Sequence, residues 1–257
     1  MRAACCEATV LRNEVIAPDI RLLTVVWPDR DHAPHAGQFF TLRAGGADEA
    51  PFLSRPISVH RWNPDSSTIE FLYQVVGEGT EKLAQLKQQD TFQLTGPMGN
   101  GFDVPDILSK YKKIAVVGGG IGTAPMFQLT RELAAAGAKP DVFFGFRDTP
   151  YCMEEYRSIA NLVKVSTDTG AVGFHGFVTQ LYDPADYDVV LVCGPTVMMK
   201  NAARLCAEKG TPCFVSMEKK MACGIGACLG CTCETKGGEG KSVCKNGPVF
   251  DATEVFF

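Results

Sequence analysis

The stretch KKIAVVGGGIGTAPMFQLTRELAAAG, residues 112–137, decides the fold class of the second half of this chain. It begins with a β-branched run, continues through three consecutive glycines, and ends in a stretch with a helical pattern. A strand, a glycine turn and a helix in this order are typical of the first unit of an α/β sheet, and the glycines allow a pyrophosphate to approach the helix N-terminus. Because the spacing is G-x-G-x-G and not G-x-G-x-x-G, the turn alone does not separate a dinucleotide site from an ordinary strand-to-helix connection.

Strand-like and helix-like segments continue to alternate downstream of this turn. Strand patterns occupy 141–147, 162–168 and 187–195, and a helix-like segment occupies 152–161. This alternation predicts a parallel sheet with crossover connections. The motif CGPTVMM, residues 193–199, ends the last of these strands, where open sheets place their ligand crevice. We therefore predict a nicotinamide dinucleotide site that includes Gly119, Gly120, Gly122 and Cys193, with a small buried core residue as the alternative for Cys193.

The first part of the chain has a different pattern. Short alternating or β-branched runs lie at 20–27, 38–44, 68–76 and 90–96, separated by Gly, Pro and Asp turns. Such runs predict an antiparallel barrel or sandwich. We thus divide the chain into an antiparallel barrel domain (1–107), an α/β domain with a parallel sheet (108–212) and a glycine- and cysteine-rich segment (213–257).

Two motifs in the barrel part suit a phosphorylated ligand. SRPISV, residues 54–59, offers the Arg55 cation and the Ser58 hydroxyl beside a proline that stiffens the chain. YQVVGEGT, residues 73–80, offers backbone N–H groups around Gly79 for a pyrophosphate. A flavin phosphate and ring edge fit these groups, whereas an arginine on a strand taken alone is usually a surface charge.

The segment MACGIGACLGCTC, residues 221–233, collects cysteines at metal-ligand spacing. With a later cysteine it gives C-x4-C-x2-C-x12-C, which is the plant-type signature for a 2Fe-2S cluster. Zinc ribbons prefer two C-x2-C pairs, and only one such pair is present, so a structural zinc site is the alternative. Cys233 alternates with its neighbour as C-x-C, and we interpret it as a small buried strand residue. The predicted cluster ligands are Cys223, Cys228, Cys231 and Cys244.

Composition excludes several classes of protein. A chain of 257 residues with 46% apolar composition can bury a core without disulfides, and its eleven cysteines are an odd number. The N-terminal apolar run is broken by charges, so we expect neither a signal peptide nor a membrane span, and a reducing cytoplasm is the expected setting. A net charge of −4 gives no indication of nucleic-acid binding.

Taken in order, the motifs resemble those of the ferredoxin-reductase superfamily. RPIS, YQVVGEGT, GPMGNGF (96–102), GGGIGTAP and CGP follow one another as in that superfamily, which has an FAD-binding barrel and an NAD-binding α/β domain. With MACGIGACLGC and VCKNGPVFDATEV (243–255), the chain is similar to one branch, the electron transfer subunits of NAD-dependent, heteromeric (class 1B) dihydroorotate dehydrogenase. The resemblance covers nearly the whole chain.

This resemblance implies cofactors and a partner. A separate FMN-containing catalytic subunit, joined in a heterotetramer, would oxidise dihydroorotate to orotate in pyrimidine (UMP) biosynthesis. Electrons would pass through the 2Fe-2S cluster and FAD to NAD, because a flavin joins one-electron to two-electron carriers. No catalytic acid or base for dihydroorotate is expected in this chain. The implied FAD contacts are Arg55, Pro56, Ile57, Ser58, Leu72, Tyr73, Gln74, Gly79 and Thr80.

Other interpretations stay open at this stage. The small FAD and 2Fe-2S subunit of an electron-bifurcating NADH-dependent ferredoxin:NADP oxidoreductase shares the three-part layout, although its cluster motif begins with aspartate where this chain has Cys223. A scaffold subunit without cofactors is the alternative of another class. Ser54 stands where a basic residue is expected, and Arg147 or Asp148 would favour NADP or NAD according to which faces the ribose. The histidines are expected to be surface or structural residues: His32, His35, His60 and His175.

Overall fold

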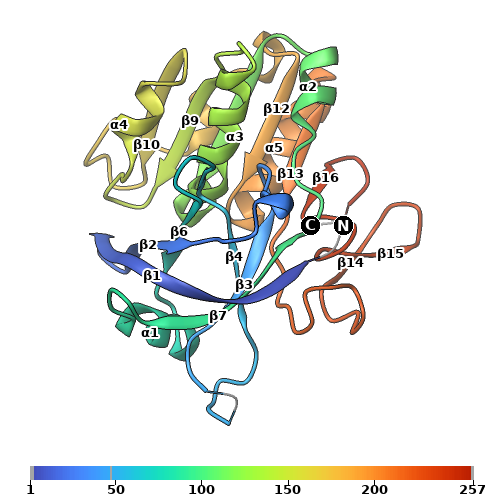
Figure 1. Ribbon diagram of the computed structural model, residues 1–257. Coiled ribbons are helices and arrows are strands. Elements are labelled where there is room, and N and C mark those ends of the chain that lie inside the picture. Colours follow the sequence, from blue (N-terminus) through green and yellow to red (C-terminus); the bar gives the residue numbers. More distant parts are fainter. Residues whose placement is uncertain (1–2, 47, 256–257) are drawn as a thin grey trace.

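The computed structural model describes residues 3–46 and 48–255, and arranges them as two seven-stranded sheets with a small C-terminal lobe (Figure 1). The first sheet is antiparallel and the second is parallel apart from one edge strand. The predicted combination of an antiparallel half and a parallel α/β half is therefore confirmed. No helix in the described ranges combines the length and the apolar character that a membrane span needs.

The first sheet is strongly curled and has the strand order β4-β3-β7-β1-β2-β6-β5. Its edges are tied by consecutive residues: the Val59 N–H donates to Gln38 O on the β3 side (3.0 Å), and the His60 N–H donates to Glu70 O on β6 (2.9 Å). Alternate side chains fill the interior, where Phe40 packs edge-to-face on Trp27 and Phe71. The strands are β1 Ala4–Ala17, β2 Ile20–Val26, β3 Phe39–Arg43, β4 Arg55–Ser58, β5 Arg61–Asn63, β6 Thr68–Gln74 and β7 Thr91–Met98.

The second sheet has the order β11-β10-β9-β8-β12-β13-β16 and is covered by helices on both faces (Figure 1). Alternation along β8 sends Val116 to the side packed by α3, and Val117 to the side packed by α5. The strands are β8 Ile114–Gly119, β9 Asp141–Phe146, β10 Leu162–Thr167, β11 Phe174–His175, β12 Val189–Cys193, β13 Cys213–Ser216 and β16 Val249–Asp251. The helices of the whole chain are α1 Glu78–Gln85, α2 Val104–Lys110, α3 Thr123–Ala135, α4 Met153–Arg157 and α5 Thr196–Lys209, with 3-10 turns at Arg30–His32, Gly120–Gly122, Val178–Gln180 and Pro184–Asp186.

The segment 217–248, which we call the cysteine lobe, is inserted between the last two strands of the second sheet. β13 pairs in parallel with β12, and β16 returns antiparallel to β13 after the lobe. The lobe contains one hairpin, β14 Thr232–Glu234 and β15 Gly240–Ser242. The predicted domain limits stay a prediction, and the structure adds that 213–216 continue the parallel sheet.

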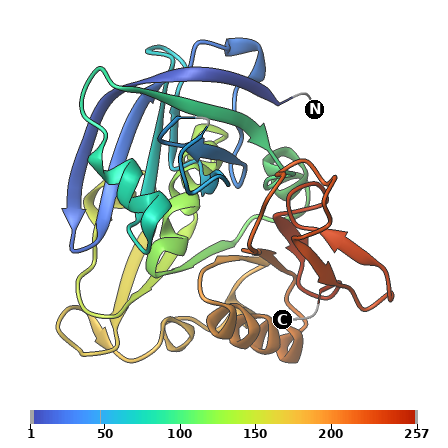
Figure 2. The same cartoon turned by 90° about the horizontal axis from the view of Figure 1, so that it is seen from below.

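The cysteine lobe also contacts the first sheet. Asn100, just beyond β7, donates its backbone N–H to Gly247 O (2.6 Å) and its side-chain amide to Lys245 O (3.1 Å). Figure 2 shows the lobe, in red, beside the end of green β7 and near the orange helix α5. The lobe is therefore attached to both sheets.

Candidate functional site

A cavity of about 370 Å³, which we call the RPIS cavity, lies where the two sheets and the cysteine lobe meet. The predicted FAD contacts converge on it from β4, β6 and α1. Those that line it are Arg55, Pro56, Ile57, Ser58, Leu72, Tyr73, Gln74 and Thr80. Gly79 stands behind Arg55, because a Cβ at Gly79 would lie 2.1 Å from Arg55 Nε.

The start of helix α1 is organised by Thr80. Its hydroxyl accepts from the N–H groups of Val76 (2.9 Å) and Gly77 (3.1 Å), and donates to Gly77 O (2.8 Å). The hydroxyl thus closes the first turn of the helix. Thr80 and Glu81 donate their own N–H groups to Gly77 O (2.9 Å each), so the N–H groups that this turn offers to an anion are those of Glu78 and Gly79. Arg55 is positioned beside this turn by a bond from Nη1 to Leu53 O (2.9 Å).

The opposite walls of the RPIS cavity come from residues that sequence reasoning missed. Ile121 lies in the glycine turn, Ala124 and Pro125 lie in the first turn of α3, and Phe39 lies on β3. The cysteine lobe and its neighbours contribute Ser216, Met217, Glu218, Lys219, Met221 and Pro248. Their position in the sequence could have indicated this, since residues 216–219 form the end of strand β13 and the turn directly after it, at the edge of an α/β sheet where ligands bind. Desolvation raises the pKa of Glu218 on this wall.

A second cavity of about 400 Å³, the glycine-turn cavity, lies at the carboxyl ends of the parallel strands. Gly119 and Gly120 line it, together with Gly145, Phe146, Pro195 and Met198. Arg147 and Asp168 also line it, whereas Asp148 does not belong to its wall. Gly120 faces this cavity and its neighbour Ile121 faces the RPIS cavity, so a single turn separates the two.

Gly122 and Cys193 lie behind these walls and line neither cavity among the described residues. A Cβ at Gly122 would lie 2.4 Å from Gly194 Cα and 2.6 Å from Cys193 O. Gly122 therefore permits the glycine turn to pack against the CGP turn. Cys193 is 1% exposed, and burial raises the pKa of its thiol.

The four predicted cluster ligands form two pairs in the cysteine lobe. The backbone N–H of Cys228 donates to Cys223 Sγ, and that of Cys244 donates to Cys231 Sγ, each at 3.4 Å. Within the part of the chain that the structure describes, no three of these four sulfurs lie mutually within 4.8 Å. A single tetrahedral ion needs four adjacent ligands, whereas a two-iron cluster takes two thiolates at each iron. The arrangement therefore fits a 2Fe-2S cluster better than zinc.

Backbone N–H groups point at the sulfurs of these pairs. Gly226 N donates to Cys244 Sγ (3.1 Å) and Cys228 N to Cys223 Sγ (3.4 Å). Desolvation alone would raise the pKa of Cys223, but N–H donors around it outweigh burial and lower the pKa to about 6. The loop is thus built to stabilise thiolate charge, as cluster ligands require. Cys233 is 3% exposed and donates instead to Lys241 O (3.3 Å).

The cysteine pairs and the RPIS cavity are parts of one continuous segment. Met221 lines the cavity and precedes Cys223 by two residues, so their Cα atoms are at most about 7 Å apart. Gly224 is packed on the first sheet, where a Cβ would lie 2.9 Å from Met98 Sδ. A ligand in the RPIS cavity is therefore close to the cysteine pairs.

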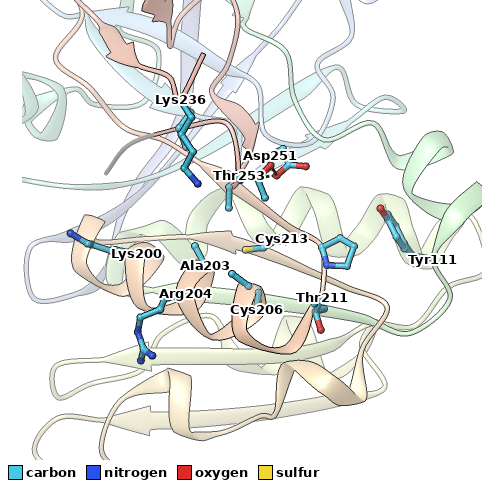
Figure 3. A pocket seen from close by; sticks show the side chains of 15 residues that line it. Tyr111, Lys200, Ala203, Arg204, Cys206, Thr211, Cys213, Lys236, Asp251 and Thr253 are labelled. Carbon is cyan, nitrogen blue, oxygen red and sulfur yellow. Dashed lines mark hydrogen bonds between the residues drawn. The ribbon is translucent and has the colours of Figure 1, made fainter. Parts of the chain in front are cut away.

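A further cavity of about 690 Å³ lies between α5 and the C-terminal segment (Figure 3). Figure 3 shows Lys200 and Arg204 on one side, and Lys236, Asp251 and Thr253 on the other. None of the predicted cofactor residues lines it.

Comparison with known proteins agrees with this geometry. Residues 218–256 match the model of the iron-sulfur cluster binding domain of dihydroorotate dehydrogenase B, a range that contains all four paired cysteines. The electron transfer subunit of NAD(+)-dependent dihydroorotate dehydrogenase B from Clostridium acetobutylicum is 47% identical over 219 residues, 85% of each chain. Its counterpart from Caldanaerobacter subterraneus subsp. tengcongensis is 39% identical over 256 residues, 98% of each chain. The chain belongs to the family of dihydroorotate dehydrogenase B electron transfer subunits.

Solved structures place this dihydroorotate dehydrogenase B family member in the ferredoxin-reductase fold. The NADH-dependent reduced ferredoxin-NADP oxidoreductase structure aligns with a TM-score of 0.85 at 27% identity, over 97% of this chain and 89% of that one. A ferredoxin NADP+ reductase from Neisseria gonorrhoeae, with bound FAD and NADP, aligns with a TM-score of 0.66 at 17% identity, over 85% and 95%. The expected superfamily and branch are confirmed, and so is the prediction of an iron-sulfur segment.

Proposed function

We propose that this chain is the electron transfer subunit of an NAD-dependent dihydroorotate dehydrogenase in pyrimidine (UMP) biosynthesis. A partner with FMN would oxidise dihydroorotate. The 2Fe-2S cluster of this chain would pass the electrons one at a time to FAD, and FAD would transfer them as hydride to NAD. The observation that carries the proposal is the continuity of the paired cysteines with the RPIS cavity through Met221 and Cys223.

The RPIS cavity has the groups that FAD needs. Arg55 supplies a cation that reaches phosphate, and the first turn of α1 supplies N–H groups for the pyrophosphate. Tyr73 lines the wall, donates its hydroxyl to Asn13 Oδ1 (3.2 Å), and has a pKa raised to about 12 by burial. It stays neutral at physiological pH, so it adds no negative charge beside the ring. Apolar walls exclude water from the place where the ring would lie.

NAD is assigned to the glycine-turn cavity. Gly119 and Gly120 leave room for a phosphate in its wall, and Val197 and Met198 place the start of helix α5 there, where N–H groups attract an anion. Because only the Gly120–Ile121 turn separates this cavity from the RPIS cavity, a nicotinamide that extends over the turn reaches the flavin ring. Arg147 lines the cavity and Asp148 does not, so the acidic group that we assign to the ribose hydroxyls of NAD is Asp168.

Four cysteines of the lobe would hold the cluster, with one iron at each pair. The N–H donors to their sulfurs would tune its potential. Cys233 is not assigned as a ligand, because it faces the Lys241 carbonyl.

A partner subunit is expected to dock on the cysteine lobe. Ile225 and Leu229 lie between the cluster ligands and are 61% and 65% exposed. Large apolar side chains at such exposure favour a protein interface, and docking there would bring the FMN of a catalytic subunit near the cluster. We propose a cytoplasmic heterotetramer that contains two copies of this chain and two catalytic subunits.

The assay that tests the proposal uses the purified full-length chain, isolated without oxygen, alone and with its FMN subunit. The visible spectrum should show flavin and iron-sulfur bands, and NADH should reduce artificial acceptors. Dihydroorotate should be oxidised with NAD only after the FMN subunit is added. Turnover of dihydroorotate by the chain alone would refute the assignment of dihydroorotate oxidation to the FMN subunit. A colourless protein would favour the interpretation as a scaffold subunit without cofactors.

The structural neighbour at TM-score 0.85 supports a second candidate, a subunit of an NADH-dependent reduced ferredoxin-NADP oxidoreductase. Sequence relatives of the dihydroorotate dehydrogenase B family at up to 47% identity, and a cysteine at 223, favour the first candidate. The second candidate would be preferred if this chain reduced ferredoxin together with NADP(H) and showed no activity toward dihydroorotate in any complex.

A further inference from the structure

Three metal-binding side chains meet at the seam between the two sheets, outside the cavities described above. His60 connects β4 to β5 in the first sheet, while Cys152 and Glu155 lie at the start of α4 in the α/β half. The ligand atoms of these residues (His60, Cys152 and Glu155) lie mutually within 4.8 Å. The three residues come from parts of the chain that are far apart in sequence, so the fold itself brings them together.

The imidazole of His60 is arranged as a metal ligand. It is 1% exposed, stacks on Phe127 at 4.9 Å between ring centroids, and places Nδ1 2.8 Å from Ala124 O. Because a carbonyl only accepts, Nδ1 carries the hydrogen and Nε2 has a free lone pair. Nε2 is buried and has no hydrogen-bond partner. Metal-binding histidines typically have their other ring nitrogen bonded to a carbonyl in this way.

Cys152 is held toward His60 by an unusual backbone conformation. Its φ of 60° and ψ of 21° lie in the left-handed region, which costs a non-glycine residue of order 1 kcal/mol or more. Such strain persists where a structural or functional requirement holds it. Burial raises the pKa of the thiol to about 12. The thiol is therefore unreactive by itself, and ionises only if a cation binds to it.

Charged side chains surround His60, Cys152 and Glu155, and they leave one carboxylate oxygen for a divalent cation. Glu155 Oε2 is 2.6 Å from Arg61 Nη2 and 4.0 Å from His60 Nε2, and its second oxygen remains a possible ligand. Arg61 also approaches Glu70 Oε2 at 3.3 Å, so its charge is shared between two carboxylates. Arg131 contributes a further positive charge nearby. Arg61 and Arg131 already balance Glu70 and Glu155, so a bound divalent ion together with the Cys152 thiolate would leave one net positive charge at this place.

We propose that His60 Nε2, Cys152 Sγ and a Glu155 oxygen bind one Zn²⁺ ion that joins the two sheets. Nitrogen, sulfur and oxygen in one set suit zinc, whereas Ca²⁺ and Mg²⁺ prefer oxygen ligands. Zinc bonds of about 2.0–2.3 Å need these atoms closer than 4.8 Å, so the site contracts by up to about 1 Å when it binds. The thiol proton is released to solvent, no electron is transferred, and water takes the fourth position.

The ion would hold a contact beside the RPIS cavity. His60 is hydrogen-bonded to Ala124, which lines the RPIS cavity. The other two residues of the proposed site lie at the start of α4, which follows β9 in the second sheet. Zinc bound here would therefore link the start of α4 to the His60–Ala124 contact at the wall of that cavity. This role is independent of the cluster ligands, so it can be tested whether or not the proposed function holds.

The test uses the full-length chain with its iron intact, titrated with Zn²⁺ in competition with a chromophoric chelator. The variants are Cys152→Ser and Glu155→Gln, and the matched control is Cys6→Ser, which removes another half-buried thiol. Wild type and C6S should bind one Zn²⁺ per chain with iron unchanged. C152S should bind at least about tenfold more weakly, because even outer residues of zinc sites cost that much.

The ligand set is checked by zinc K-edge X-ray absorption on the wild type. The expected spectrum has one sulfur at about 2.3 Å and the remaining ligands nitrogen or oxygen. A sulfur-rich spectrum accompanied by loss of iron would place zinc in the cysteine lobe and overturn the proposal. Equal affinity of C152S and wild type, or no binding by wild type at micromolar Zn²⁺, would overturn it as well.

Discussion

Replacing Gly79 with alanine should displace Arg55 without unfolding the chain. A Cβ at this position would lie 2.1 Å from Nε, 2.6 Å from Cζ and 2.7 Å from Nη2 of Arg55. These atoms belong to the far end of a flexible side chain, so the guanidinium moves away and the backbone stays. The matched control is Gly77→Ala in the same motif, because a Cβ at Gly77 would meet no heavy atom within 4 Å.

The magnitude follows from the role proposed for Arg55. A hydrogen bond to a charged group contributes about 1.5–3 kcal/mol. Loss of the Arg55 contact to an FAD phosphate should therefore weaken FAD binding by about 10- to 150-fold. Gly79 lies in helix α1, where alanine is favoured over glycine by roughly 0.5–1 kcal/mol. The free energy of unfolding of the flavin-free protein should therefore stay the same or rise.

The assay is quenching of FAD fluorescence during titration of flavin-free protein, with chemical denaturation of the same samples. Arg55→Ala should lose as much affinity as G79A, and G77A should bind like wild type. If G79A binds FAD as tightly as wild type, or if G77A loses as much affinity, Arg55 is not a flavin contact. Loss of FAD in G79A with a parallel loss of stability would also reject the argument, because displacement of Arg55 does not unfold the chain.

Other substitutions test the remaining parts of the site and the fold. Cys228→Ser should lose iron while Cys233→Ser keeps it, as measured by an iron assay; the opposite pattern would exclude the proposed ligand set. Gly122→Ala should lower the free energy of unfolding by about 1–3 kcal/mol, since its Cβ meets immovable backbone, and unchanged denaturation would contradict this packing. Burial raises the pKa of Glu132 above its usual 4.5, so this carboxyl contributes stability at low pH that is lost as pH rises through the raised pKa. Glu132→Gln, which stays neutral, should therefore gain stability relative to wild type between pH 4.5 and pH 7 in denaturant titrations; a difference that does not change with pH would show that the carboxyl is not held protonated.

Local patterns predicted the elements that positioned the site. The run at 112–120 became β8, and 141–147 became β9, because buried parallel strands are short apolar runs between glycines. The convergence of Arg55 and its neighbours on one cavity was predictable because they are consecutive on one strand, and their assignment to FAD stays a prediction. The grouping of the four cysteines was predictable because three of them lie within one loop, and their role as the cluster ligands stays a prediction.

Contacts between distant segments were not visible in the sequence. Cys213–Ser216 is only four residues long and joins the sheet through pairing with β12 and β16. Met221 and Pro248 reach the RPIS cavity only after the lobe folds back on the barrel. Gly122 and Cys193 were predicted to line a dinucleotide site, and the structure places them in the packing behind it. Their assignment to NAD stays a prediction.

The bonds of Asn100 to the cysteine lobe have a consequence for motion. The lobe is held by the parallel sheet at β13 and β16 and by the end of β7 through Asn100, so it bridges the two halves of the chain. A hinge that opened the halves would first have to break this bridge. We therefore expect the separation between the RPIS cavity and the paired thiols to stay constant during the proposed turnover, so that the rate of electron transfer between them does not respond to solvent viscosity.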